Sequence, residues 1–278
     1  MIYLLLAILS SAMVSIVMRL STNRVQNNVA MLVMNYLMCL VLAGLYTGFG
    51  NLFPQSGALP QTLGMGAVHG ALYLASFVLL QVNVKKNGVV LSATFMKLGL
   101  LVPMILSMVL FGEQPELLQI IGFITAIAAI VLINMEKDSS VMGSKIGLAL
   151  LLIGGGSADA MSKVFEELGD KSLSDQFLFY TFIAALVLCV MLMLSKKQRP
   201  QKAEIFWGLL IGIPNFFSAK FLLRSLEDVA AVIAYPTYSV ATMLVITLAG
   251  VLFFKEKLGK RQWTALGVIL VALALLNT

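Results

Sequence analysis

The chain has 278 residues, of which 60% are apolar and 12% are charged, and its net charge is +6 at pH 7. Soluble domains carry about 25% charged residues, so this composition excludes an ordinary water-soluble domain. The apolar residues fill whole segments instead of one helix face or alternate strand positions, which excludes an outer-membrane barrel. The sequence therefore predicts an all-α polytopic membrane protein.

Ten segments are long and apolar enough to cross a bilayer, since a spanning helix takes about 20 residues. The first begins MIYLLLAILSS with no basic leader, so we expect a membrane helix and not a signal peptide. The connections are short, and none could hold a soluble domain. The expected spans are residues 2–20, 29–50, 61–84, 88–111, 115–134, 144–165, 174–195, 203–224, 228–254 and 260–277.

Basic residues are divided unevenly between the connections. The even-numbered connections hold only Lys163, Lys171 and Arg224. Because Lys and Arg accumulate in cytoplasmic loops, we expect both termini outside, in a plasma membrane of the bacterial inner-membrane type. This clustering at segment ends also argues against a nucleic-acid partner. The odd-numbered connections hold Arg19, Arg24, Lys85, Lys86, Lys137, Lys145, Lys196, Lys197, Arg199, Lys202, Lys255, Lys257, Lys260 and Arg261.

The sequence also repeats itself. FGEQPELLQIIGFITAIAAIVLIN begins at Phe111, and FKEKLGKRQWTALGVILVALALLN begins at Phe254. Each half, 1–137 and 138–278, holds five expected spans, and because five is odd the second half crosses the membrane in the opposite sense. Such an inverted repeat is typical of secondary transporters that work by alternating access. The polar or glycine matches are Glu113/Glu256, Gln119/Gln262, Asn134/Asn277, Gly66/Gly208 and Gly70/Gly212.

The two motifs that close the halves, LFGEQPELLQIIG and FFKEKLGKRQWTALG, resemble the EamA family of the drug/metabolite transporter (DMT) superfamily. The resemblance extends over the whole chain and implies a transporter with a central cavity between two five-helix repeats. It implies that spans one, three, four, six, eight and nine line the cavity and that spans two and seven act as gates. Spans five and ten would lie at the periphery, often at a homodimer contact. The first span contains ILSSAMVSIVMRL where many members have Trp-Gly, so no particular substrate is implied.

Lys97 is a single charge in the apolar run VLSATFMKLGLLVPMILSMVLFG. A charge at that depth costs about 2.5–3.5 kcal/mol, so we expect it to face a polar path and to bind an acidic group or titrate. The alternative is a structural pair with a buried acid. Asp159 in IGGGSADAMSK is the expected counterpart, although it could instead pair with Lys163 on one helix face. A cation and an anion together suit a zwitterion or a proton-coupled exchange.

Other polar side chains in the expected spans are candidates for substrate binding or coupling. His69 is the only histidine, and Tyr73 lies one turn away. The alternative for the histidine is an ordinary hydrogen bond between helices. Tyr235, Tyr238 and Asn215 lie next to prolines, which free a backbone carbonyl, and their alternative role is kinking and packing. The expected gating residues are Asn35, Tyr36 and Tyr180.

Charged residues near the ends of the spans have other expected roles. Lys220 and Arg224 lie near the outer end of the eighth span, where we expect an interfacial charge cluster or an outer vestibule. Glu113 and Glu256 lie at membrane edges, where we expect them to be structural and to bond loop backbone.

No motif for catalysis is present in the sequence. It contains no P-loop and no HExxH, and GGGSADA lacks the second glycine of a nucleophile elbow. We therefore expect no enzyme activity, no cofactor and no metal site. The favoured function is a secondary active transporter that exports an amino acid or related small polar metabolite across the lipid bilayer, coupled to protons or exchange. The alternatives are an importer of a choline-like cation or a nucleobase, and a lipid translocator or membrane scaffold that does not transport.

Overall fold

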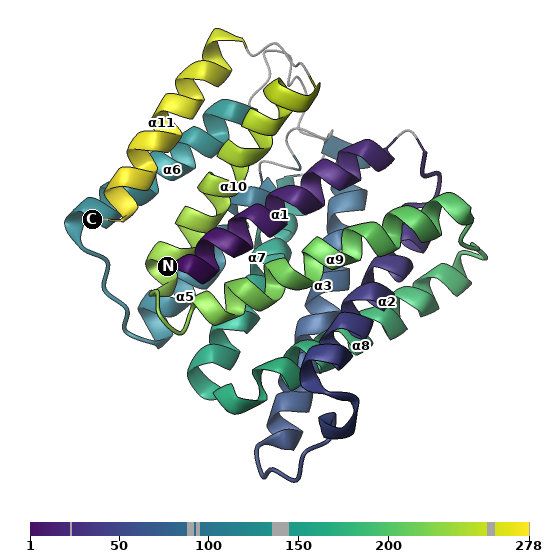
Figure 1. Ribbon diagram of the computed structural model, residues 1–278. Helices are drawn as coiled ribbons and strands as arrows, with labels where there is room; N and C mark the ends of the chain where they lie inside the picture. The colour runs from purple at the N-terminus through teal and green to yellow at the C-terminus, as the bar shows by residue number, and fades with distance from the viewer. Residues whose placement is uncertain (23, 88–91, 93–94, 135–144, 255–258, 278) are drawn as a thin grey trace. The chain divides into compact units, whose positions relative to one another are not determined.

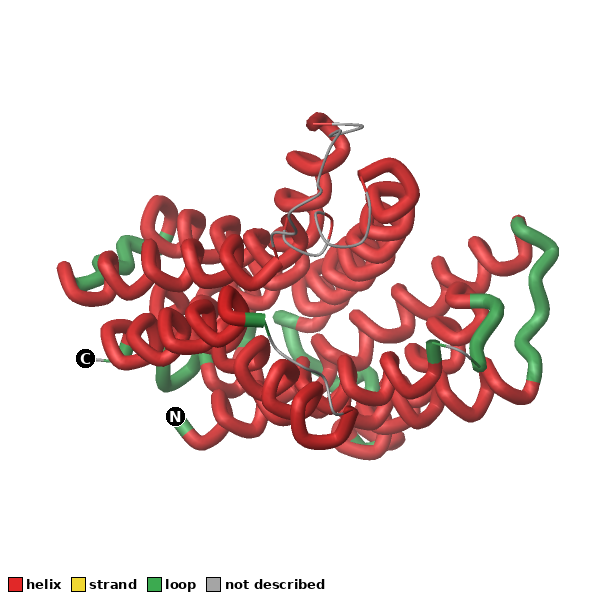
Figure 2. The backbone as a smooth tube through the Cα atoms, turned by 90° about the horizontal axis from the view of Figure 1, so that it is seen from above, coloured by secondary structure: helices red, strands yellow, loops and turns green. Residues whose placement is uncertain are grey.

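The computed structural model describes residues 1–278 except 23, 88–91, 93–94, 135–144, 255–258 and 278 (Figure 1). Every regular element in these described ranges is helical, as Figure 2 shows along the backbone, which confirms the all-α prediction. The elements in chain order are α1 (Ile2–Ser21), α2 (Asn28–Thr47), η1 (Phe49–Asn51), α3 (Leu59–Asn87), η2 (Leu98–Leu100), α5 (Leu101–Leu110), α6 (Leu117–Asn134), α7 (Lys145–Leu168), η3 (Lys171–Leu173), α8 (Ser174–Ser195), α9 (Lys202–Ser225), α10 (Ala231–Phe254) and α11 (Lys260–Leu276).

The described helices have the length and surface of membrane spans. Seven of them are long and apolar enough to cross a bilayer, and three further apolar helices are shorter, at Phe95–Leu110, Leu117–Leu132 and Trp263–Leu276. Large apolar side chains such as Val109 and Leu117 are exposed, which a water-soluble protein would avoid over so wide a surface. The chain is therefore a multi-pass membrane protein.

Local sequence signals account for where two of these helices begin. At the start of α2, the side chain of Asn27 accepts hydrogen bonds from the backbone N–H groups of Val29 and Ala30, each at 3.1 Å. At the start of α9, Gln201 and Glu204 form a capping box. Glu204 also accepts from the backbone N–H of Asn27 at 3.2 Å, so the first turn of α9 holds the connection between α1 and α2.

Two compact units make up the fold. Unit 1 comprises Met1–Leu74 and Val164–Glu227, and unit 2 comprises Ala75–Lys163 and Asp228–Thr278. Each unit combines elements from both halves of the sequence, and α3 and α7 contribute to both units. The expected boundary between the halves at residues 137 and 138 lies outside the described residues, so that division stays a prediction.

Unit 1 is organised around α2, which packs against α8 and α9, while α1 packs against α9. Glycines allow the closest crossings: a Cβ on Gly208 or Gly212 of α9 would lie 2.5 Å from a methionine Cβ of α2. The glycine pair at matching positions of the first half, Gly66 and Gly70 of α3, approaches α8 in the same way. Because α2 and α8 also occupy matching positions, the two glycine pairs make equivalent crossings.

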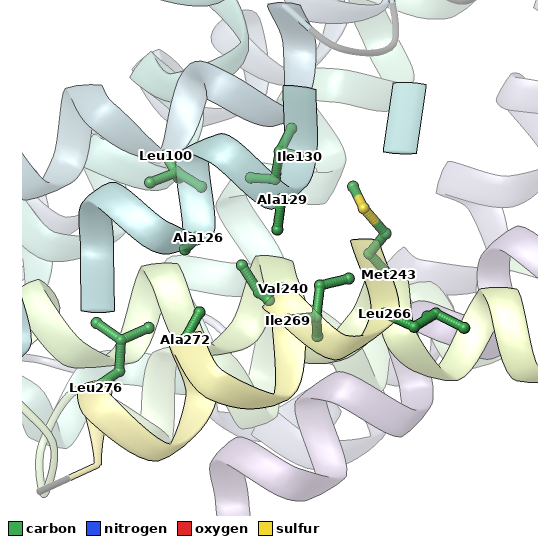
Figure 3. Packing of buried hydrophobic residues seen from close by; sticks show 10 residues of the cluster. All are labelled: Leu100, Ala126, Ala129, Ile130, Val240, Met243, Leu266, Ile269, Ala272 and Leu276. Carbon is green, nitrogen blue, oxygen red and sulfur yellow. The ribbon is translucent and has the colours of Figure 1, made fainter. Parts of the chain in front are cut away.

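Unit 2 has an apolar core between α6, α10 and α11. Small residues on α6 and α11 let the two helices lie side by side, and larger side chains fill the space around them (Figure 3). The members of this core are Leu100, Ala126, Ala129, Ile130, Val240, Met243, Leu266, Ile269, Ala272 and Leu276.

Candidate functional site

The helix that carries Lys97 changes its winding directly after this residue. Residues 95–97 are α-helical, η2 follows, and α5 begins at Leu101. A stretch of 3₁₀-helix inside a longer helix is wound more tightly and often marks a functional position. Lys97 is half-buried at this junction in unit 2. Most of the preceding part of the expected span, residues 88–91 and 93–94, lies outside the described residues.

At η2 the chain approaches α7 backbone to backbone. A Cβ on Gly99 would lie 2.8 Å from the backbone nitrogen of Gly156, and a Cβ on Gly156 would overlap the carbonyl oxygen of Gly99. The glycine run of α7 therefore has the close-packing role that the sequence indicates. Lys97 lies two residues before Gly99 and Asp159 lies three residues after Gly156, so both charges belong to one crossing. We call this the α7–η2 crossing.

Lys97 and Asp159 interact electrostatically at the α7–η2 crossing. Both side chains are half-buried. Among the described side chains, these two do not meet in a direct ion pair of the kind that joins Lys163 to Glu113. The crossing thus holds a basic and an acidic side chain that interact over a distance without forming an ion pair.

Helix α10 reaches the same crossing through Tyr235. The tyrosine is 1% exposed, and its hydroxyl donates a hydrogen bond of 2.6 Å to the backbone carbonyl of Asp159. Tyr238 is three residues further on, so it lies on the same face of α10, and it is half-buried. Pro236 stands between the two tyrosines, yet α10 continues past it as a single helix. Three predicted site residues therefore lie close together in unit 2. Lys97 and Asp159 are at the α7–η2 crossing, and Tyr235 binds the backbone of Asp159.

Lys163 pairs with Glu113 and not with Asp159. The Lys163 Nζ lies 2.8 Å from a carboxylate oxygen of Glu113, which also accepts from the backbone N–H groups of Ala231 (3.1 Å) and Val232 (3.0 Å). Burial raises the pKa of Glu113, but the hydrogen bonds from Lys163 and the two amides lower it by more, so the pKa lies below its ordinary value. The predicted backbone-bonding role of Glu113 is confirmed, whereas Glu256 lies outside the described residues.

His69 lies in an aromatic cluster of unit 1. Its ring centroid is 5.1 Å from that of Phe177 and 4.8 Å from that of Tyr73, and its Nδ1 is 3.2 Å from the hydroxyl of Thr181. Thr181 donates its one hydroxyl proton to the carbonyl of Phe177 at 2.8 Å. This arrangement favours the tautomer in which the Nδ1 of His69 carries a proton and donates to Thr181. The contact joins α3 to α8, so it is the hydrogen bond between helices that the sequence analysis gave as the alternative role of His69. A role of His69 and Tyr73 in substrate binding stays a prediction.

Asn215 belongs to a polar network between α9 and α2 in unit 1. Its side-chain amide donates to Asn35 at 3.2 Å and to the sulfur of Cys39 at 3.6 Å. Asn215 thus contacts a predicted gating residue. The other predicted gating residues are Tyr36, which is buried on α2, and Tyr180, whose hydroxyl donates at 2.5 Å to a carbonyl in the loop after α2.

The charged residues at the C-terminal end of α9 form ion pairs in unit 1. Arg224 lies 2.6 Å from Glu227, and Lys220 lies 2.5 Å from Asp175. These pairs form a charge cluster, and Asp175 joins it although the sequence did not single it out. The predicted position of the cluster at the membrane interface stays a prediction. The sequence signal for Asp175 is its place as an acidic residue in the first turn of α8. Thr181, the partner of His69, was also not singled out, and its signal is a hydroxyl group on the side of α8 that faces the glycines of α3.

Metal ligands do not gather in the described parts of the chain. Among those residues, no group of three His, Cys, Asp or Glu side chains could hold a metal ion. Cys39 and Cys189 are buried free thiols.

Comparison with known proteins supports the resemblance drawn from the two closing motifs. The chain is 25% identical over 227 residues to an uncharacterized protein of Haemophilus influenzae (strain ATCC 51907 / DSM 11121 / KW20 / Rd), over 80% of this chain and 75% of that protein. A solved structure described as "Crystal structure of protein" has the same fold, with a TM-score of 0.72 at 15% identity over 99% of this chain and 94% of that one. The sequence model of the EamA-like transporter family matches residues 1–135 and 145–278. The chain therefore belongs to the EamA-like transporter family of the DMT superfamily.

Proposed function

We propose that the chain is a secondary active transporter that exports an amino acid or a related small polar metabolite by alternating access. The observation that carries this proposal is the pair of opposite charges, Lys97 and Asp159, at the α7–η2 crossing. Membership of a transporter family supports the transport function and not an enzyme activity. The residues of the crossing support the substrate class.

Two charges inside apolar helices need compensation, because each costs about 2.5–3.5 kcal/mol near the middle of a bilayer. An amino acid supplies both partners in one molecule, with a carboxylate for Lys97 and an ammonium for Asp159. Two charges held apart at one crossing suit such a zwitterion better than a ligand of single charge. Tyr235 is fixed on the Asp159 backbone, and the hydroxyl of Tyr238 on the same face of α10 can bind a polar substrate group.

The same pair offers a route for coupling. Asp159 can take up a proton from one side of the membrane and release it to the other side, and the net charge of the crossing then changes by one at each of the two steps. Transport driven by a proton gradient can use this change.

We further infer the arrangement in the membrane. The seven long helices and the three shorter ones would give ten crossings as two inverted five-helix repeats, and the equivalent glycine crossings of unit 1 support that symmetry. The distribution of Lys and Arg supports termini on the outside of a bacterial-type inner membrane, and we propose that two copies of the chain form a homodimer. A reporter fused at Thr278 should report an outside location, and a cytoplasmic signal would overturn this orientation.

The substrate class can be tested by thermal unfolding of the purified protein at pH 6 and pH 8 with amino acids, nucleobases, sugars and quaternary amines. A ligand at about 100 times its dissociation constant adds about 2.7 kcal/mol of stability. We expect stabilisation by an amino acid that is lost in Lys97→Ala and Asp159→Asn. The control is Lys86→Ala, at an exposed lysine, and this variant should still be stabilised by the amino acid. Amino-acid stabilisation that survives in both site variants would overturn the site, and stabilisation by quaternary amines alone would overturn the substrate class.

A further inference from the structure

Unit 1 contains a cavity of about 330 Å³ at the start of α1, the start of α8 and the end of α9. This volume lies within the range of roughly 300–1,000 Å³ in which proteins bind small molecules. Charged and apolar side chains share its walls. Those that matter for recognition are Tyr3, Asp175, Lys220, Phe221, Arg224 and Glu227.

The lining carries an excess of positive charge. Three cations, Lys171, Lys220 and Arg224, face two carboxylates, Asp175 and Glu227, which gives a net charge of 3 − 2 = +1. The ammonium of Lys220 and the guanidinium of Arg224 each already form an ion pair. An ammonium has three N–H donors and a guanidinium has five, so both groups retain donors for a second, incoming acceptor.

An aromatic wall lies beside these cations. The rings of Tyr3 and Phe221 are stacked with centroids 6.3 Å apart, and the ring of Phe217 extends the stack at 5.5 Å from Phe221. The guanidinium of Arg224 is 5.9 Å from the centre of the Tyr3 ring. A guanidinium and an apolar ring surface therefore lie beside each other in the lining, where one small molecule can contact both.

We propose that this cavity is a binding site for a small organic carboxylate with an aromatic or apolar body. The carboxylate contacts Lys220 and Arg224, and the body packs against Tyr3 and Phe221. The positive excess of the lining disfavours an amine with the same body. This site uses residues of unit 1 alone and goes beyond the proposed transport function, which rests on Lys97 and Asp159.

The test uses 3-phenylpropionate as the probe, with its binding to the purified full-length protein measured by calorimetry in a neutral detergent. We expect binding that weakens at least tenfold in Arg224→Gln and in Lys220→Gln, and that is retained in Lys220→Arg. Arg199→Gln, at an exposed arginine of the connection between α8 and α9, is the matched control and should leave affinity within twofold of the wild type. An amine with the same body, 3-phenylpropylamine, should not compete.

Thermal unfolding of each variant shows whether it is folded, and Lys220→Arg keeps the test informative if Lys220→Gln is not. Unchanged affinity in Arg224→Gln and Lys220→Gln, or equal binding of the amine, would overturn the proposal. Lys97→Ala should keep the probe bound, so failure of this site and failure of the transport site are distinguishable.

We also expect equal affinity of the probe in nanodiscs of phosphatidylcholine and of phosphatidylglycerol. Loss of binding in phosphatidylglycerol alone would assign the cavity to lipid head groups and overturn the proposal.

Discussion

The ammonium of Lys163 and the carboxylate of Glu113 form an ion pair of 2.8 Å in which the two side chains are only 3% and 14% exposed. The pair joins three elements of unit 2, because Lys163 lies on α7, Glu113 follows α5, and the carboxylate also binds the first turn of α10. Negative charge at a helix N-terminus is favourable. Glu113 thus binds the first turn of α10, the helix whose Tyr235 contacts the α7–η2 crossing.

Removal of either partner of this pair should destabilise the protein strongly. When one member of a buried ion pair is lost, the remaining charge stays out of water without its partner, which costs about 3–5 kcal/mol. We expect losses of this size in the free energy of unfolding for Lys163→Met and for Glu113→Gln, measured by thermal unfolding in detergent.

The double variant separates the pair from its surroundings. Lys163→Met with Glu113→Gln should be less destabilised than the sum of the two single variants, since no charge remains buried. Lys86→Met is the control, because Lys86 is an exposed lysine of α3 and its loss should change stability by less than about 1 kcal/mol. Additive single effects would show that the two residues act independently.

The lowered pKa of Glu113 predicts a dependence of stability on pH. A carboxyl group whose pKa is lower in the folded than in the unfolded protein adds stability at pH values above its unfolded pKa, about 4.3 for glutamate. That contribution is lost as the pH falls through the lower, folded pKa. The stability difference between wild type and Glu113→Gln should be constant from pH 8 to about pH 5 and should shrink on further acidification. A difference that grows with acid would contradict the charge network.

The contact between Gly99 and Gly156 predicts that α7 tolerates no side chain there. In Gly156→Ala the new Cβ would overlap the Gly99 carbonyl and lie 2.7 Å from the Cβ of Val102. We expect a loss of about 1–3 kcal/mol in thermal unfolding, as for other overpacked cores. Gly267→Ala is the control, since nothing lies within 4 Å of its Cβ, and it should be neutral or stabilising by up to about 1 kcal/mol. Equal effects of the two substitutions would argue against the backbone crossing.

The helical membrane fold and the ionisable residues inside its helices follow from the sequence, because long apolar runs and isolated ionisable residues have few alternative explanations. Lys97 and the glycines before Asp159 indicated a polar crossing, and the structure places both at the α7–η2 crossing. The partner of Lys163 could not be predicted in this way. Its spacing of four residues from Asp159 on one helix allowed a local pair as an alternative, whereas Glu113 comes from a distant loop that only the tertiary fold brings near.

The polar contacts of unit 1 show the same limit. His69, Asn35 and Asn215 stood out as polar groups in apolar helices, but their partners depend on which helices cross and at what height. Asn215 donates to Asn35 across the contact of α9 with α2, a partner that the sequence did not indicate, and its predicted role in substrate binding or coupling stays a prediction. Single-chain periodicity identifies the face of a helix, and not the helix opposite that face.

The hydrogen bond from His69 to Thr181 supplies the last prediction. Thr181→Val keeps the shape of the side chain but removes the acceptor of the Nδ1 proton, and His69 is only 1% exposed. A buried donor deprived of its acceptor costs about 1–3 kcal/mol, so thermal unfolding should show a loss of this size. The control is Thr264→Val. Thr264 is an exposed threonine of α11 whose hydroxyl binds a carbonyl of its own helix, and the change should alter stability by less than about 0.5 kcal/mol.

The resonance of the Nδ1 proton, in protein labelled with ¹⁵N-histidine, should be present in the wild type and shifted in Thr181→Val. A wild-type histidine protonated only at Nε2 would contradict the assigned hydrogen bond, because Thr181 would then have to donate to His69 and release the carbonyl of Phe177.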